Sequence, residues 1–317
     1  MKQKLLFIKI DALGDNIIFS SIIPFLKEKY DITVLCQNAF INLYNYSGIE
    51  AIGLYSSDKL HDCNPDIVIN AHFSRTEQSD FMAQIMGKKA KERIAFSGDC
   101  CNIYPDKKIE GDSFYSILLE TKEEQELYRY KAILNYLGVK VKRDDLKRQI
   151  FKKNKVAVEH SDYLEKLFSS FPGDYIVICP RPAYSYKSYP FWDKILEGLD
   201  IPFVALGLPP YNTTILEAAE IIRKSKLVIG VDTGLLHMSV ALNKPSIVLC
   251  GGGHWNRFFS PEDNVRIFSN HCEYRGCNWL CKHNNFHCVK GINYIEVRNY
   301  LNEAISKSQA KQKKVQV

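Results

Sequence analysis

Short apolar runs alternate along the chain with segments whose apolar residues recur at helical spacing. Continuous apolar runs are typical of buried parallel strands, and recurrence every three or four residues is typical of amphipathic helices. The alternation predicts an α/β protein with parallel sheets covered by helices. We expect strands at 5–10, 32–36, 67–70, 175–179, 202–206, 227–231 and 246–250, and helices at 17–29, 123–137, 191–199, 215–225 and 294–305.

The length of the chain indicates two domains. With 317 residues and 46% hydrophobic content, it is too long for one ordinary core and suits two domains of about 150 residues each. The most charged stretch, residues 140–155, is a plausible link. We therefore expect domains at 1–155 and 156–305. Residues 306–317 carry four lysines and no acid, which predicts a disordered basic tail that aids solubility or contacts anionic lipid weakly.

Charge and apolar content exclude several classes of protein. The formal net charge of +6 favours anionic ligands, but without a basic stripe or a nucleic-acid-binding motif we expect no nucleic-acid partner. No apolar stretch is long enough to span a membrane. Asp11 interrupts the first apolar run, which we interpret as a strand of a cytoplasmic protein and not as a signal peptide. The ten cysteines are then expected to be reduced thiols or metal ligands.

Three polar segments follow predicted strands, where α/β folds bind their ligands. The first is Leu13-Gly14-Asp15. Asp15 could cap the following helix by accepting a backbone N–H bond, or act as a general base on an incoming hydroxyl. Asp11, four residues earlier, could take either part. In the second segment, Arg181 and Lys187 precede a predicted helix; they suit phosphate binding or are solvated loop charges.

The third segment is Asp232-Thr233-Gly234, between a buried strand and a helix. Backbone N–H groups at this helix start, the Thr233 hydroxyl and close approach at Gly234 suit a diphosphate. His237 lies one turn further on the same side, where it is a ligand contact or a structural residue. Gly252, in a glycine run after the next strand, allows a second close approach. No Walker loop or G-x-G-x-x-G fingerprint occurs, which argues against a nicotinamide-dependent dehydrogenase.

A cysteine cluster lies near the C-terminus. Four of its cysteines lie within 17 residues, close enough for their thiolates to close a tetrahedral, structural Zn or Fe site, although their spacing matches no standard C-x-x-C pairing. Ordinary buried thiols are the alternative. The cluster comprises Cys272, Cys277, Cys281 and Cys288, with His271, His283 and His287 beside them.

These motifs together resemble glycosyltransferase family 9, the bacterial heptosyltransferases related to lipopolysaccharide core assembly. The resemblance runs from residue 5 to about 305 and implies a GT-B fold with two Rossmann-like domains facing a central cleft. The N-terminal domain would bind the acceptor and the C-terminal domain the nucleotide sugar. The resemblance rests on three motifs, Leu13-Gly14-Asp15, Lys187-x-x-Pro190-x-Trp192 and Val231-Asp232-Thr233-Gly234-Leu235-x-His237.

The resemblance implies an inverting, metal-independent transfer with Asp15 as catalytic base. Lys187 would neutralise the diphosphate, and the rest of the third motif would line the donor pocket. ADP-heptose is the family's usual donor, and the acceptor would be a glycan or lipopolysaccharide core at the inner face of the inner membrane. The chain departs from the family at Cys250-Gly251-Gly252-Gly253-His254-Trp255, where a Phe-Gly-Pro-Thr-like turn is common.

That departure leaves alternatives to the family's usual reaction. They are a different nucleotide sugar, a protein acceptor, or a non-catalytic GT-B protein that binds a nucleotide or glycan. A metal- or redox-responsive regulator would rest on the cysteine cluster alone.

Overall fold

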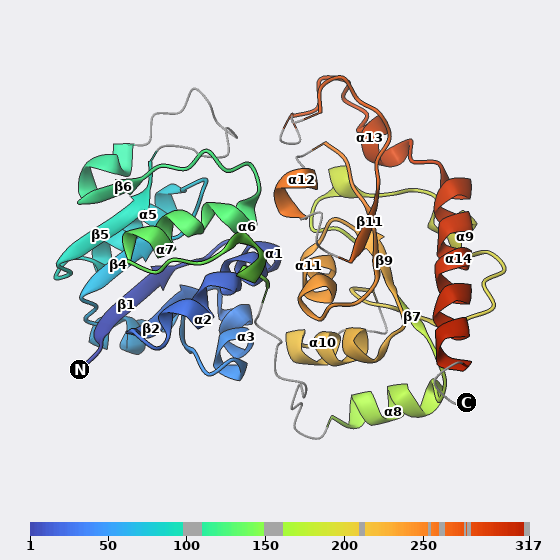
Figure 1. Ribbon diagram of the computed structural model, residues 1–317, viewed down its shortest axis with the longest axis horizontal. Coiled ribbons are helices and arrows are strands. Elements are labelled where there is room, and N and C mark those ends of the chain that lie inside the picture. Colours follow the sequence, from blue (N-terminus) through green and yellow to red (C-terminus); the bar gives the residue numbers. More distant parts are fainter. Residues whose placement is uncertain are drawn as a thin grey trace. The chain divides into compact units, whose positions relative to one another are not determined.

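The chain forms two compact units, Met1–Asn154 and Lys155–Val317, each built on one parallel sheet (Figure 1). The computed structural model describes residues 1–97, 110–148, 161–208, 213–252, 255–259, 264–275, 277 and 280–313. Part of the predicted link, residues 149–155, lies outside these ranges. None of the helices within them combines the length and the apolar character needed to cross a membrane.

The first unit has a six-stranded sheet in the order β3-β2-β1-β4-β5-β6. Its central strand β1 pairs in parallel with β2 on one side and β4 on the other. The apolar runs predicted as strands are buried here because both neighbours and the covering helices exclude water from them. The strands are β1 (Gln3–Ile8), β2 (Tyr30–Cys36), β3 (Glu50–Gly53), β4 (Ile67–Asn70), β5 (Glu92–Phe96) and β6 (Ile117–Leu119).

Helices connect these strands, and two of the predicted helices are broken. The segment predicted at 17–29 is divided by a 3-10 turn, Ser20–Ile22, because Pro24 cannot donate the backbone hydrogen bond that a continuous helix needs there. The segment predicted at 123–137 forms two short helices. The helices of this unit are α1 (Leu13–Phe19), α2 (Ile23–Leu26), α3 (Ile41–Tyr46), α4 (Ser57–Asp62), α5 (Glu77–Met86), α6 (Glu126–Arg129) and α7 (Lys131–Tyr136).

The second unit has a five-stranded sheet in the order β11-β10-β9-β7-β8. Every residue of β7, β9 and β10 is buried. The strands are β7 (Ile176–Cys179), β8 (Phe203–Ala205), β9 (Val228–Val231), β10 (Ser246–Leu249) and β11 (Val265–Phe268). The helices are α8 (Asp162–Ser170), α9 (Trp192–Leu196), α10 (Ile215–Lys224), α11 (Gly234–Ala241), α12 (Trp255–Phe258), α13 (His287–Lys290) and α14 (Tyr294–Lys313).

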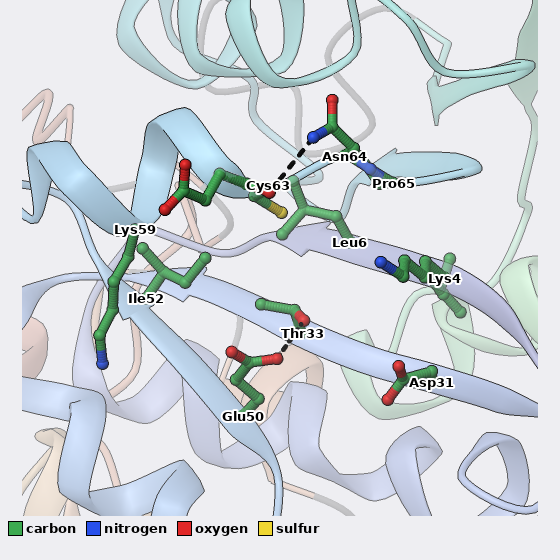
Figure 2. A pocket seen from close by; sticks show the side chains of 12 residues that line it. Lys4, Leu6, Asp31, Thr33, Glu50, Ile52, Lys59, Cys63, Asn64 and Pro65 are labelled. Carbon is green, nitrogen blue, oxygen red and sulfur yellow. Dashed lines mark hydrogen bonds between the residues drawn. The ribbon is translucent and has the colours of Figure 1, made fainter.

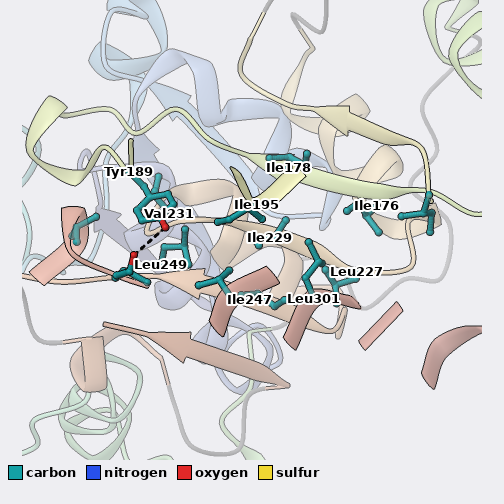
Figure 3. Close-up of a cluster of buried hydrophobic side chains, with 14 of the residues drawn as sticks. Ile176, Ile178, Tyr189, Ile195, Leu227, Ile229, Val231, Ile247, Leu249 and Leu301 are labelled. Carbon is teal, nitrogen blue, oxygen red and sulfur yellow. Dashed lines mark hydrogen bonds between the residues drawn. The ribbon is translucent and has the colours of Figure 1, made fainter. Parts of the chain in front are cut away.

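One core cluster of the second unit joins its strands to its last helix (Figure 3). Ile176, Ile229 and Ile247 come from three neighbouring strands, and Val297 and Leu301 of α14 are fully buried against the same cluster. Such burial of large aliphatic side chains contributes about 1.5–3 kcal/mol each. The C-terminal helix is therefore part of the core and does not merely decorate it.

The prediction of a disordered tail at 306–317 is wrong as far as Lys313, because α14 continues to that residue. Its Ala, Gln and Lys residues are good helix formers. Glu303 and Lys307 also form an ion pair one turn apart, which adds modest support. Residues 314–317 of the predicted tail lie outside the described residues.

Candidate functional site

Polar side chains gather at the carboxyl ends of the strands in each unit. In the second unit, Lys187 follows β7 and Asp232 follows β9, two strands that pair in parallel up to Cys179 and Gly230. The Lys187 Nζ lies 2.8 Å from Asp232 Oδ2. On the other carboxylate oxygen, His237 Nε2 lies 3.5 Å from Oδ1. Sheet register thus unites residues that are far apart in sequence.

Burial and charge set the ionisation of this group. Burial alone would raise the pKa of Asp232, but the Lys187 ammonium and the His237 contact hold it well below its ordinary value. Burial acts on Lys187 in the opposite sense, yet Asp232 raises its pKa above the ordinary value. Both groups are charged at neutral pH. The His237 ring lies flat on Phe259, with centroids 4.7 Å apart.

The helix that follows Asp232 is not capped by a side chain. Thr233 occupies the N-cap position of α11 without a side-chain capping bond. The Thr233 Oγ1 atom is buried and has no hydrogen-bond partner among the described residues. A buried hydroxyl without a partner is costly, and a ligand oxygen at the helix start would supply one.

The other predicted donor contacts are less closely joined. Arg181 is exposed in the loop after β7, and Gly234 is half-buried at the start of α11. Gly252 has a left-handed backbone, with φ of +60°, and its carbonyl accepts a bond from the Cys277 thiol. The glycines at 251 and 252 therefore allow close approach of the cysteine segment, and donor contact by Gly252 stays a prediction. Gly253 lies outside the described residues.

In the first unit, Asp15 lies in the first turn of α1, whose N-cap is Ala12. Neither Asp15 nor Asp11 is therefore the cap, which was one of the two interpretations of this segment. Asp15 is half-buried. Burial lowers the pKa of Lys9, but the charges of Asp11 and, next, Asp15 raise it above its ordinary value. Lys9 is completely buried, and its Nζ donates to Asp11 Oδ2 at 2.7 Å.

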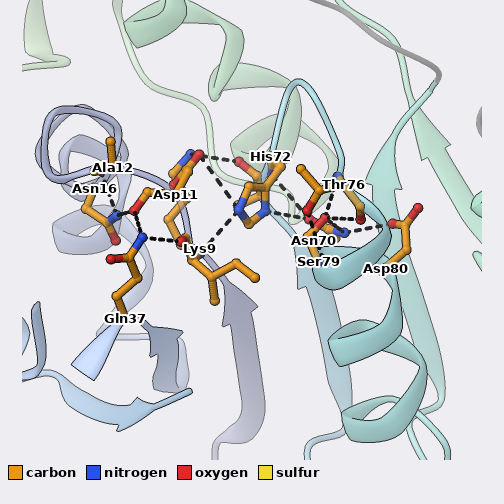
Figure 4. Close-up of polar contacts among 12 residues, drawn as sticks. Lys9, Asp11, Ala12, Asn16, Gln37, Asn70, His72, Thr76, Ser79 and Asp80 are labelled. Carbon is orange, nitrogen blue, oxygen red and sulfur yellow. Dashed lines mark hydrogen bonds and ion pairs between the residues drawn. The ribbon is translucent and has the colours of Figure 1, made fainter. Parts of the chain in front are cut away.

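A hydrogen-bonded chain extends from this loop to β4 and α5 (Figure 4). The backbone N–H of Ile10 donates to His72 Nε2, so Nδ1 carries the hydrogen and donates to Asn70 Oδ1 at 2.8 Å. The Asn70 amide in turn donates to Asp80 Oδ1 at 2.9 Å. Burial lowers the pKa of His72 to about 4 despite the charge of nearby Asp11. The imidazole is therefore neutral and fixed in one tautomer at neutral pH.

Sequence reasoning missed Lys9, Asn70, His72 and Arg75 in this group. Lys9 is concealed inside an apolar strand pattern, and Arg75 pairs with Asp112 across 37 residues. The Asn70-Ala71-His72 segment follows a correctly predicted strand, so the rule that drew attention to Asp15 could also have found it.

The cysteine cluster has a different arrangement from the one predicted. Among the described residues, the ligand atoms of Cys272, His283 and His287 lie within 4.8 Å of one another. One thiolate and two imidazoles suit Zn or Fe. Cys281 is half-buried. Burial raises the pKa of its thiol, but backbone N–H groups of the following turn outweigh that effect and lower it. Burial raises the pKa of Cys288.

A cavity of about 270 Å³ lies in the first unit, at the amino-terminal ends of β1 and β2 (Figure 2). Two lysines and three acidic residues line it, namely Lys4, Lys59, Asp31, Glu50 and Asp62, and the Thr33 hydroxyl donates to Glu50. It contains none of the predicted site residues and lies at the opposite end of the strands from Asp15.

Two Rossmann-like units, each built on a parallel sheet, place the chain in the GT-B class of α/β folds. The model of glycosyltransferase family 9 (heptosyltransferase) matches residues 193–285. A search of curated proteins gave no significant match. The family match and the fold together confirm the resemblance to glycosyltransferase family 9 and identify the chain as a glycosyltransferase.

Solved structures share this fold over nearly the whole chain. A family 9 glycosyltransferase from Veillonella parvula is 14% identical with a TM-score of 0.72, covering 97% of this chain and 98% of its own. The E. coli heptosyltransferase WaaC, solved with ADP-2-deoxy-2-fluoro heptose, is 13% identical with a TM-score of 0.64, covering 95% and 99%. The iron-containing dodecameric glycosyltransferase TibC from enterotoxigenic E. coli is 14% identical with a TM-score of 0.60, covering 98% and 78%.

Proposed function

We propose that the protein transfers a heptose from ADP-heptose to a bacterial surface glycan or lipopolysaccharide core, with inversion and without a catalytic metal. The observation that carries the proposal is the buried Lys187–Asp232–His237 group at the start of α11. It holds an ammonium beside helix N–H groups and an unpartnered Thr233 hydroxyl. Those features stabilise the negative charge that develops on a departing nucleoside diphosphate. WaaC binds an ADP-linked heptose analogue, which supports this choice of donor.

Asp15 is the proposed base. Transfer requires removal of a proton from the acceptor hydroxyl as it attacks the sugar's anomeric carbon, and a carboxylate can accept that proton. Asp11 is a poorer candidate because one of its oxygens is bound to Lys9 at 2.7 Å. The neighbouring backbone is also fixed, since Asn16 and Gln37 donate to the Asp11 carbonyl oxygen. In this proposal the N-terminal unit binds the acceptor and the C-terminal unit binds the donor.

The test compares Asp15→Asn with Asp11→Asn. Release of ADP from ADP-heptose is measured with a heptose-free lipopolysaccharide core as acceptor, and ADP binding is measured by calorimetry. We expect Asp15→Asn to lower turnover by about 10²- to 10⁴-fold, the usual contribution of a general base, with ADP affinity unchanged. Normal turnover in Asp15→Asn would remove this residue from the mechanism. Loss of turnover in Asp11→Asn but not in Asp15→Asn would assign the role of general base to Asp11.

We further propose that Cys272, His283 and His287 bind a structural Zn or Fe ion. The support is their proximity, the N/S character of the ligands and the presence of iron in TibC. The ion would hold the segment that packs on Gly251 and Gly252 and would take no part in transfer. Location at the cytoplasmic face of the inner membrane, with weak lipid contact through the lysines of residues 307–314, belongs to the same proposal.

A further inference from the structure

Lys9 is a buried lysine directly after β1, at the end of the strand where the polar groups of the first unit gather. Its exposed fraction is 0%. An ammonium removed from water is costly unless protein groups pair with it and accept its hydrogen bonds. The groups around Lys9 therefore indicate what its charge does in this unit.

The Lys9 ammonium has polar and aromatic contacts from several segments. Its Nζ donates to Asp11 Oδ2 at 2.7 Å (Figure 4) and to the carbonyl oxygen of Ala71 at 3.3 Å. It also lies 5.9 Å from the ring centroid of Phe73 and 5.5 Å from that of Tyr130, within the range of cation–π attraction. Because these partners come from the loops after β1 and β4 and from the junction of α6 and α7, they fix the ammonium in place.

Three carboxylates surround this one ammonium. Burial lowers the pKa of Lys9, whereas the charges of Asp11, Asp15 and Glu126 raise it. Glu126, from α6, is itself only 2% exposed. His72 adds no charge at neutral pH, because burial lowers its pKa to about 4. The ammonium therefore offsets negative charge that belongs to three different acids.

Two other polar groups border this charge cluster. Burial raises the pKa of Tyr44 well above its ordinary value, so its phenol is neutral. The guanidinium of Arg129 lies 5.5 Å from the ring centroid of Phe73, and its Nε donates to a backbone carbonyl oxygen. Lys9 is the cation that bonds to the loop leading into Asp15.

A carboxylate beside other carboxylates resists ionisation, and a nearby cation favours it. A general base accepts a proton only in its ionised form. We propose that Lys9 is a positioning residue for transfer: it holds Asp11 in a buried ion pair and keeps Asp15 ionised as the proton acceptor. The inference rests on the proposed function, because Asp15 is the base of that reaction. Being fully buried, Lys9 acts through the two carboxylates and not on the reacting atoms.

The test is the pH dependence of kcat/KM in the transfer assay, whose acid limb reports the ionisation of the base in the free enzyme. Lys9→Met removes the cation, so its acid limb should move to higher pH by about one unit. Asp11→Asn removes a negative charge and leaves the ammonium, so its limb should move to lower pH. Lys9→Arg should keep the wild-type limb because the charge remains. Lys29→Met is the matched control, since this lysine of the same unit also donates to a backbone carbonyl oxygen and lies over a tyrosine ring.

Opposite shifts in Lys9→Met and Asp11→Asn are the expected signature, because a purely structural defect would lower turnover without moving the acid limb. Asp11→Asn is nearly isosteric, so its shift alone decides the test if Lys9→Met fails to fold. An acid limb that is unmoved in Asp11→Asn, or that moves in the same direction in both variants, would refute the positioning role. If that result accompanies a loss of turnover in Asp15→Asn, the proposed base stands. Normal turnover in Asp15→Asn would instead remove the base and, with it, the role of Lys9.

Discussion

Replacing Lys187 with methionine should destabilise the second unit because it leaves a buried carboxylate without its partner. The side chain of Asp232 is 6% exposed and that of Lys187 is 19% exposed. Removing one partner of a buried ion pair costs about 3–5 kcal/mol. The partial exposure of Lys187 favours the lower end, about 3 kcal/mol. For a unit of this size, that corresponds to a fall in Tm of about 6–12 °C.

The sign of the pH dependence follows from the two pKa shifts. The lowered pKa of Asp232 means that the pair's contribution is complete above the carboxylate's ordinary pKa and is lost as pH falls through the lowered value. Because the pKa of Lys187 is raised, the stabilising contribution of the pair is lost at high pH only as the pH rises through that raised pKa. Measurement at pH 7 therefore records the full effect.

The assay is thermal unfolding of the ligand-free protein, followed by circular dichroism. Lys226→Met is the matched control: its ammonium is 20% exposed and lies 3.1 Å from Asp174, but that carboxylate is 35% exposed. Such a pair contributes about 0–1 kcal/mol. Lys187→Met/Asp232→Asn should recover part of the loss by removing the unpaired charge. The reasoning is refuted if Lys187→Met melts no lower than the control, or if the double variant is no more stable than the single one.

Two further predictions concern His72 and the cysteine segment. Because burial lowers the pKa of His72 to about 4, the unfolded chain binds one more proton between that pH and about 6.5, and the free energy of unfolding should fall by about 1.4 kcal/mol for each pH unit of acidification across this window. Urea denaturation at several pH values measures this slope, and an unchanged slope in His72→Gln would contradict it. Elemental analysis of purified protein should find about one Zn or Fe per chain, lost in Cys272→Ser but retained in the control Cys63→Ser; equal metal content in both variants would exclude Cys272 as a ligand.

Most interior strands were predictable from the sequence because a continuous apolar run indicates a buried strand without knowledge of its neighbours. Strands β4, β7 and β9 match their predicted segments to within a residue. Strands β3, β5, β6 and β11 were not predicted. Strands β3, β6 and β11 each lie at the edge of a sheet, whereas β5 lies between β4 and β6 and its sequence begins with two charged residues, Glu92 and Arg93. Edge strands are short and half-exposed, as in β6, so their sequences resemble loops and their structure comes from the neighbouring strand.

The candidate site was predictable where polar residues lie between the carboxyl end of a strand and the first turn of the next helix. This rule found Asp15 and Asp232, whose position depends on local chain order. It could not find the bond from His72 to Asn70 or the ring of Phe286 beside Tyr186. Those contacts depend on side-chain direction and on pairing between distant segments, which hydrophobic patterning does not encode.

The burial of α14 in the core of the second unit has a consequence for how that unit is made. Strands β7, β9 and β10 precede Val297 and Leu301 by many residues, yet all contribute to one cluster. During synthesis, the strands would emerge with one apolar face uncovered until the last helix arrives. The second unit would thus complete its core only after α14 docks, and until then chaperones would have a hydrophobic surface to recognise.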